Sequence, residues 1–336
     1  MASCRNIITV ALAITCAAIA RAQTPAWPVV SSAGADLWFH GVATVALGGP
    51  GRLPLSDSAD VSRVRSAKAT LGVRTALDSA APSLGAALRA DPAFEVLHFV
   101  PPYFSRSNPA AMLAAVRRVA DGGAGTSGFG VDERFGATAL SAALPTAGQR
   151  RVLRDLVVAL QDEWTRFYRG YRMNAIRPEA LAEALNTWGP LVGALRPYLV
   201  WAGLDGGQLM VSPALGPDGR FFEGAPDLRD DNVVAVWLPP DHPADAAYFA
   251  VRELCYPAVR RALPEGAMPA DRADAENLSG RAAVWCGEML LRRFASDRVA
   301  AYREAWMRAV GERGTFEDAF AVPAEVTRAL ERTLHF

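Results

Sequence analysis

The sequence of 336 residues has no excess of charge of either sign and almost no lysine. Lys and Arg together number 35, Asp and Glu also number 35, and Lys68 is the one lysine. A chain without a positive surplus is not expected to bind nucleic acid through the phosphate backbone. Apolar residues make up 51% of the chain, which is typical of a globular protein, and the length allows one large domain or two.

Long apolar runs are also missing. The stretch Ile7–Ala20 is apolar but shorter than the ~20 residues that a membrane-spanning helix needs. It follows the positive charge of Arg5 and precedes Ala20-Arg21-Ala22, which carries small residues at both recognition positions of a signal peptidase. We therefore expect residues 1–22 to be a cleaved secretory signal peptide. The mature protein is then periplasmic or secreted, with no membrane span.

Cysteine is scarce. Cys4 and Cys16 belong to the expected signal peptide, so only Cys255 and Cys286 remain. Two cysteines alone cannot supply the four ligands of a structural zinc site. In an oxidising compartment the pair favours one disulfide over a redox motif, and the sequence leaves open whether the bond forms.

Helical periodicity dominates the chain except in its middle. Between residues 208 and 238 three short segments are rich in β-branched and aromatic residues: Gln208–Leu215, Gly219–Glu223 and Val233–Leu238. The turn Gly216-Pro217-Asp218-Gly219 predicts a β-hairpin between the first two. Helical spacing returns at Ala244–Leu263. The sequence therefore predicts an α+β fold that is mostly helical, with one small antiparallel sheet directly before that helix.

A glycine-rich segment suggests how the chain is divided. Residues 122–130 are rich in glycine and read as a flexible linker. We expect a mainly helical region over residues 23–121, before the linker. Residues 131–336, after it, are expected to contain the remaining helices and the small sheet.

The helix after the sheet carries a resemblance to a known family. Its stretch Arg252-Glu253-Leu254-Cys255-Tyr256 resembles the active helix of zincin metallopeptidases, in which H-E-x-x-H places two zinc-binding histidines around a glutamate base. The resemblance implies that Glu253 stands at the base position, and that Arg252 and Tyr256 stand at the two histidine positions. It also implies that Glu288 stands where the gluzincin branch carries its third ligand.

The departure from the zincin motif decides the expected chemistry. Arginine has no lone pair for a metal, and tyrosine is a poor zinc ligand at neutral pH. The four histidines form no His-x-x-x-His pair: His40, His98, His242 and His335. We therefore expect no metal and no cofactor, and Glu253 as a vestigial base. The sequence favours an exported, non-catalytic zincin-like protein that binds a protein or peptide. The alternatives are an active exported peptidase with an unrecognised site and a purely structural helical protein.

Two expectations about this region compete. The Arg252 guanidinium is expected near the position of the lost cation, paired with Glu288 or Glu253. On a regular helix Cys286 lies about 160° from Glu288, so one face cannot present Glu288 to Arg252 and Cys286 to Cys255 together. A break at Gly287 is the one local feature that would relieve the conflict.

Overall fold

The computed structural model describes residues 27–45, 56–100, 103–104, 108–122, 129–223, 232–263, 268–311 and 314–335. The predicted signal peptide, residues 1–22, lies outside the described residues, as does most of the predicted linker 122–130. In the described part of the chain, no helix combines the length and the apolar character that a membrane crossing requires.

The first half of the chain is helical. Its elements, in chain order, are α1 (Ala33–Thr44), α2 (Ser58–Leu71), α3 (Ala76–Ala90), η1 (Pro92–Phe99), α4 (Pro109–Ala120), α5 (Val131–Ala143), α6 (Ala147–Glu163), η3 (Trp164–Tyr168) and α7 (Arg169–Ala175). Several begin as their sequences dictate. Asn108 caps α4 with its side chain, Pro109 takes the first helical position, and Thr146 and Gln149 form a capping box at α6.

The second half contains most of the sheet and the remaining helices. The elements are α8 (Pro178–Ala194), α9 (Arg196–Ala202), β2 (Gln208–Ser212), β3 (Arg220–Phe222), β4 (Val233–Trp237), α10 (Asp245–Leu254), α11 (Tyr256–Ala262), α12 (Arg272–Phe294), η6 (Ser296–Arg298), α13 (Val299–Val310), α14 (Phe316–Ala319) and α15 (Ala324–Leu334). The short β1 (Val29–Val30) precedes α1. The predicted class, a mostly helical α+β fold with one small sheet, is confirmed.

The sheet differs from the prediction in two respects. Its order is β1-β2-β4-β3, with β1–β2 and β2–β4 parallel and only β3–β4 antiparallel. The sheet is therefore mixed rather than antiparallel, and β2 and β3 do not form the predicted hairpin. The reason is burial: β2 and β4 are apolar along almost their whole length and are covered on both faces, as parallel strands usually are. The strand that begins with Arg220 is left at the edge.

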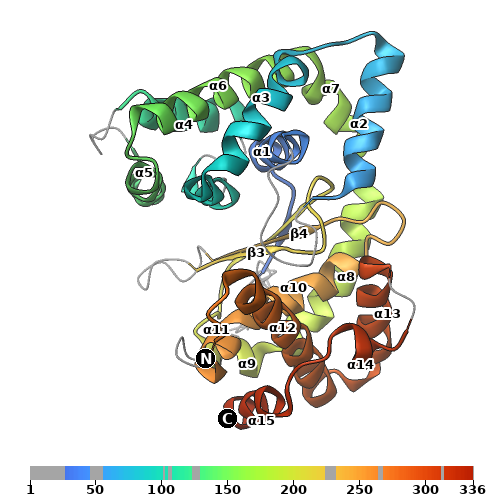
Figure 1. Ribbon diagram of the computed structural model, residues 1–336. Helices are drawn as coiled ribbons and strands as arrows, with labels where there is room; N and C mark the ends of the chain where they lie inside the picture. The colour runs from blue at the N-terminus through green and yellow to red at the C-terminus, as the bar shows by residue number, and fades with distance from the viewer. Residues whose placement is uncertain are drawn as a thin grey trace, which may run out of the picture.

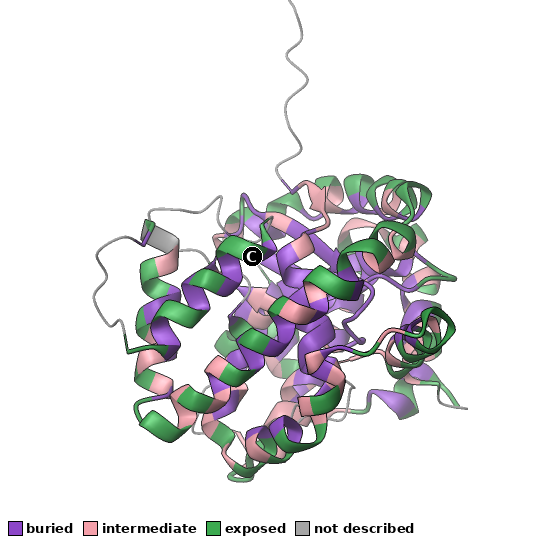
Figure 2. Ribbon diagram, turned by 90° about the horizontal axis from the view of Figure 1, so that it is seen from above, coloured by how far each residue is buried: buried purple, intermediate pink, exposed green. Residues whose placement is uncertain are grey.

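The sheet separates two apolar cores. Alternate residues of β4 point to opposite sides: Val233 and Ala235 pack with helices α1–α6, whereas Val234 and Val236 pack with α8–α15. In Figure 1 the first group of helices lies above the sheet and the second below it. Figure 2 shows the buried helix faces turned inwards. Helical residues up to Tyr171 pack in the upper core, and helical residues from Ala180 on pack in the lower core. The division of the chain at residues 122–130 stays a prediction.

Candidate functional site

The residues that resemble the zincin motif lie at the junction of α10 and α11. Arg252 and Glu253 occupy the last turn of α10, and Tyr256 begins α11. The predicted single helix Ala244–Leu263 is thus two helices. Pro257 explains the break, because a proline has no N–H to donate to the carbonyl of Glu253 one turn earlier.

Arg252 is a buried cation surrounded by carboxylates and aromatic rings. Its Nη1 donates to Asp218 Oδ1 at 3.0 Å and also to Glu253 Oε1, and the side chain is 2% exposed. Its guanidinium carbon lies 5.1 Å from the centre of the Tyr256 ring and 5.9 Å from that of Trp306. The positive charge therefore lies within cation–π distance of both rings.

Glu253 is held away from solvent. Its side chain is 1% exposed, and Oε2 has no hydrogen-bond partner among the residues that the structure describes. Gly219 covers it so closely that a Cβ on this glycine would lie 2.9 Å from Glu253 Cδ. A general base must reach a substrate proton or a water molecule. Oε1 of Glu253 is engaged by Arg252, whose counter-ion it is, and the side chain lines a cavity.

Asp218 connects two arginines at this site. Its Oδ1 accepts from Arg252, and its Oδ2 accepts from Arg220 Nη1 at 2.9 Å. Burial favours a higher pKa for the Asp218 carboxyl, but the two guanidinium groups outweigh it and leave the pKa below its ordinary value. Burial raises the pKa of Glu253, against the opposing effect of Arg252. Asp218 is therefore the firmly ionised carboxylate of the pair.

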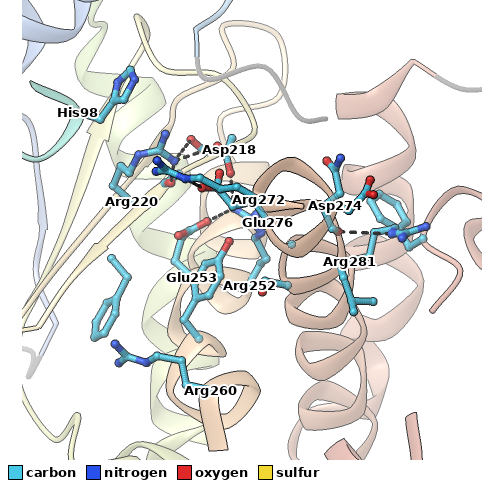
Figure 3. Close-up of a pocket in the computed structure, with 18 of the residues that line it drawn as sticks. His98, Asp218, Arg220, Arg252, Glu253, Arg260, Arg272, Asp274, Glu276 and Arg281 are labelled. Atoms are coloured by element: carbon cyan, nitrogen blue, oxygen red, sulfur yellow. Dashed lines mark hydrogen bonds and ion pairs between the residues drawn. The ribbon is translucent and has the colours of Figure 1, made fainter. Parts of the chain in front are cut away.

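A cavity of about 660 Å³ opens beside these residues. Its wall comes from η1, from the β3 region, from the α10–α11 junction and from the start of α12. Figure 3 shows Asp218, Arg220, Arg252 and Glu253 gathered on one side, with Arg281 on another. The ion pair between Arg272 and Glu95 joins α12 to η1 at this cavity. The site thus lies between the helices of the two layers, beside the edge strand.

Glu288 is not part of this cluster. Its Oε1 accepts from Arg292 Nε at 2.7 Å and from Arg303 Nη2 at 2.7 Å, and its side chain is fully buried. The point of α12 that lies against Arg252 is Gly280, where a Cβ would be 3.1 Å from Nη2. Of the two partners predicted for Arg252, the structure has Glu253, and the pairing with Glu288 is wrong. The third-ligand position that the resemblance implies therefore does not face Arg252.

Cys255 and Cys286 face each other inside the lower core. Both are buried free thiols, and their side chains are within hydrogen-bonding contact. Burial raises the pKa of the Cys255 thiol well above its ordinary value, and the Cys286 thiol beside it acts in the same direction. A buried thiol that resists ionisation is not an activated nucleophile. The helix thus presents Cys286 to Cys255 and not Glu288 to Arg252, while the disulfide itself stays a prediction.

A second group of buried charges lies in the upper layer. Glu163 accepts from Lys68 Nζ at 2.7 Å and lies 2.9 Å from His40 Nε2. Lys68 also donates to Asp78 at 2.7 Å and to Thr75 at 3.2 Å. The one lysine of the chain therefore uses all its donors to join α2, α3 and α6. This group of buried charges therefore has a structural role, and the cavity is lined by other residues.

Sequence reasoning missed Asp218, Arg220 and Gly280. The sequence predicts a hairpin turn around Asp218, but the arginine two residues later at Arg220 is a signal for a charged site. Among the residues that the structure describes, no group of three or more His, Cys, Asp or Glu is arranged to hold a metal ion. At the candidate site, the donor set consists of two arginines, two carboxylates that already pair with them, and a partly buried tyrosine whose pKa is raised by burial. Such a set suits a cation poorly.

Comparison of the chain with protein-family models, with curated proteins and with solved structures gives no match. The site must therefore be interpreted from its own geometry.

Proposed function

We propose that this chain is an exported, non-catalytic zincin-like protein that binds an extended peptide along the outer edge of β3. Two observations support the proposal: the resemblance to the zincin motif around Glu253, and the contacts of Arg252 with its neighbours. The export signal that it assumes lies in residues 1–22.

The chemistry of the residues at the site supports a non-catalytic role. Arg252 keeps its charge at any physiological pH and offers no lone pair. Glu253 is paired with Arg252 and lies close against Gly219. The cluster therefore supplies a fixed wall in which two arginines balance two carboxylates.

Peptide binding is supported by the position of β3. It is the outermost strand in the order β1-β2-β4-β3, and Gly219, Arg220 and Phe221 line the cavity. An edge strand presents unpaired backbone N–H and C=O groups, to which an extended peptide can add as a further strand. The wall of the cavity also offers mixed charges and aromatic rings for alternate side chains of such a peptide.

The observation that carries the proposal is the Asp218–Arg252–Glu253 cluster beside an edge strand and a cavity. Selection of decapeptides from a random phage-displayed library on the mature chain, followed by hydrogen exchange with a synthetic selected peptide, tests it. We expect slower exchange of the amides of residues 219–223, and an intact peptide by mass spectrometry after prolonged incubation. Cleavage of the peptide would support the active peptidase instead, and failure to enrich any peptide would support the purely structural alternative.

A further inference from the structure

The ion pairs at the cavity leave one of its arginines without a carboxylate. Five arginines line the wall, and four of them form ion pairs. Arg220 and Arg252 pair as described above, Arg260 pairs with Glu223, and Arg272 pairs with Glu95. The fifth is Arg281 on α12, and no carboxylate in the described part of the chain lies within ion-pair distance of it. Its Nε donates to the carbonyl oxygen of Asn277 at 3.4 Å, a contact within the helix.

One carboxylate of the same wall is unpaired as well. Asp274 precedes Arg281 by seven residues on α12, so the two lie on one face of the helix, about 10.5 Å apart along its axis. Among the residues that the structure describes, no ion pair joins them. Figure 3 shows both on the side of the cavity away from Asp218 and Glu253. The charge of Arg281 is therefore not balanced by a contact within this wall.

Arg281 lies beside an apolar part of the cavity. Trp285, one turn later on the same face of α12, donates its Nε1 to the carbonyl oxygen of Phe320 at 2.6 Å and holds that residue beside the helix. Phe320 lines the cavity together with Pro323 and Val310, and Arg281 is itself partly buried. A charge in such surroundings is screened less than one in open water, so it attracts an opposite charge more strongly.

We infer that Arg281 binds a carboxylate of the peptide, which comes from its free C-terminus or from an acidic side chain. The inference rests on the proposed function and names the ligand class: a peptide that carries a carboxylate next to an apolar residue. A planar guanidinium binds a carboxylate through two parallel hydrogen bonds. Neither Nη of Arg281 is hydrogen-bonded to a described residue, so both can donate to the ligand.

Amide forms of a bound peptide test this inference on the wild-type chain. The probe is a decapeptide selected on that chain and synthesised with an N-terminal fluorescein and a free carboxyl end. One further form has a C-terminal amide, and another has Asn and Gln in place of Asp and Glu. Fluorescence anisotropy measures the dissociation constants. We expect at least one amide form to bind about tenfold more weakly, which identifies the source of the carboxylate.

The substitution Arg281→Gln tests the same contact from the side of the protein. We expect it to weaken binding of the parent peptide by the same factor. Because both changes remove one contact, the weakened amide form should bind Arg281→Gln as tightly as the parent peptide does.

The matched control is Arg328→Gln on α15. Arg328 also donates its Nε to a carbonyl one turn earlier, that of Ala324 at 3.3 Å, but it does not line the cavity. Its loss should leave affinity unchanged, and thermal unfolding shows whether both variants fold as the wild type does.

Two results would overturn the inference while the peptide still protects residues 219–223, so that the proposed function stands. In the first, both amide forms bind the wild type as tightly as the parent peptide does. In the second, an amide form loses the same factor on Arg281→Gln as on the wild type, which places the carboxylate elsewhere. Failure to select any peptide would overturn both the inference and the proposed function.

Discussion

Replacing Arg252 by methionine tests whether the cation is the centre of the site. Methionine keeps apolar contact with Tyr256 and Trp306 but leaves Glu253 buried without its counter-ion. Breaking a buried ion pair on one side costs ~3–5 kcal/mol. Asp218 loses one partner but keeps Arg220, so its contribution to the loss is smaller. We expect Arg252→Met to lower the free energy of unfolding at pH 7 by about 3 kcal/mol or more.

The partner of Arg252 is identified by two double-mutant cycles in urea unfolding, followed by tryptophan fluorescence. Adding Glu253→Gln to Arg252→Met should recover about 2 kcal/mol, because it removes the stranded charge. Adding Glu288→Gln should give additive losses within ~0.5 kcal/mol, because Glu288 pairs with Arg292 and Arg303. Additive losses in the Glu253 cycle, or coupling in the Glu288 cycle, would refute the assignment.

The pH dependence of the same variant provides an independent check. Burial raises the pKa of Glu253 in the folded chain, so the folded state binds a proton that the unfolded state has already released. This contribution to stability is present below the ordinary carboxyl pKa and is lost as the pH rises through the folded value. Without Arg252 the rise in pKa is larger, so Arg252→Met should be less destabilising at pH 5 than at pH 7. An equal loss at both pH values would contradict this reasoning.

Three further predictions concern other groups. Lys68→Met should lower the free energy of unfolding by ~3 kcal/mol, because Glu163 loses its ammonium partner. Lys68→Arg should recover less than half of that loss, because a planar guanidinium cannot replace a compact ammonium. Thermal unfolding of both variants measures the two effects. Burial raises the pKa of Asp60 to about 6, so the free energy of unfolding should fall by about 2–3 kcal/mol as the pH rises from 4 to 6. In Asp60→Asn the midpoint of urea unfolding should depend less on pH over that range. In protein exported by the cell, thiol titration of the unfolded, unreduced chain should find Cys255 and Cys286 bonded, whereas two free thiols per chain would exclude the disulfide.

The sequence was informative wherever local rules decide the structure. Helical spacing, the cap at Asn108 and the β-branched composition of residues 233–238 follow from properties of neighbouring residues. The break before α11 was not predicted, although Pro257 is a local signal against a continuous helix. Glu253 was one of the two partners expected for Arg252, although neighbouring residues of a helix do not ordinarily face each other.

What could not be predicted depends on how distant elements cross. Asp218 lies on the connection between β2 and β3. Because β4 lies between those two strands in the sheet, this connection spans β4, and it brings Asp218 to Arg252 on α10. Glu288 was a reasonable third-ligand candidate by spacing. The register between α10 and α12, however, brings Gly280 and not Glu288 close to Arg252, which no local pattern specifies.

The proposed function implies that the Arg252 guanidinium stands in place of the metal of a zincin-like site. Elemental analysis of the purified mature chain after equilibration with zinc and removal of unbound metal tests it most directly. The account predicts well under one zinc per chain, with the same value for Glu253→Gln. Stoichiometric zinc that survives removal of the surface histidine His335 and is lost in Glu253→Gln would contradict it.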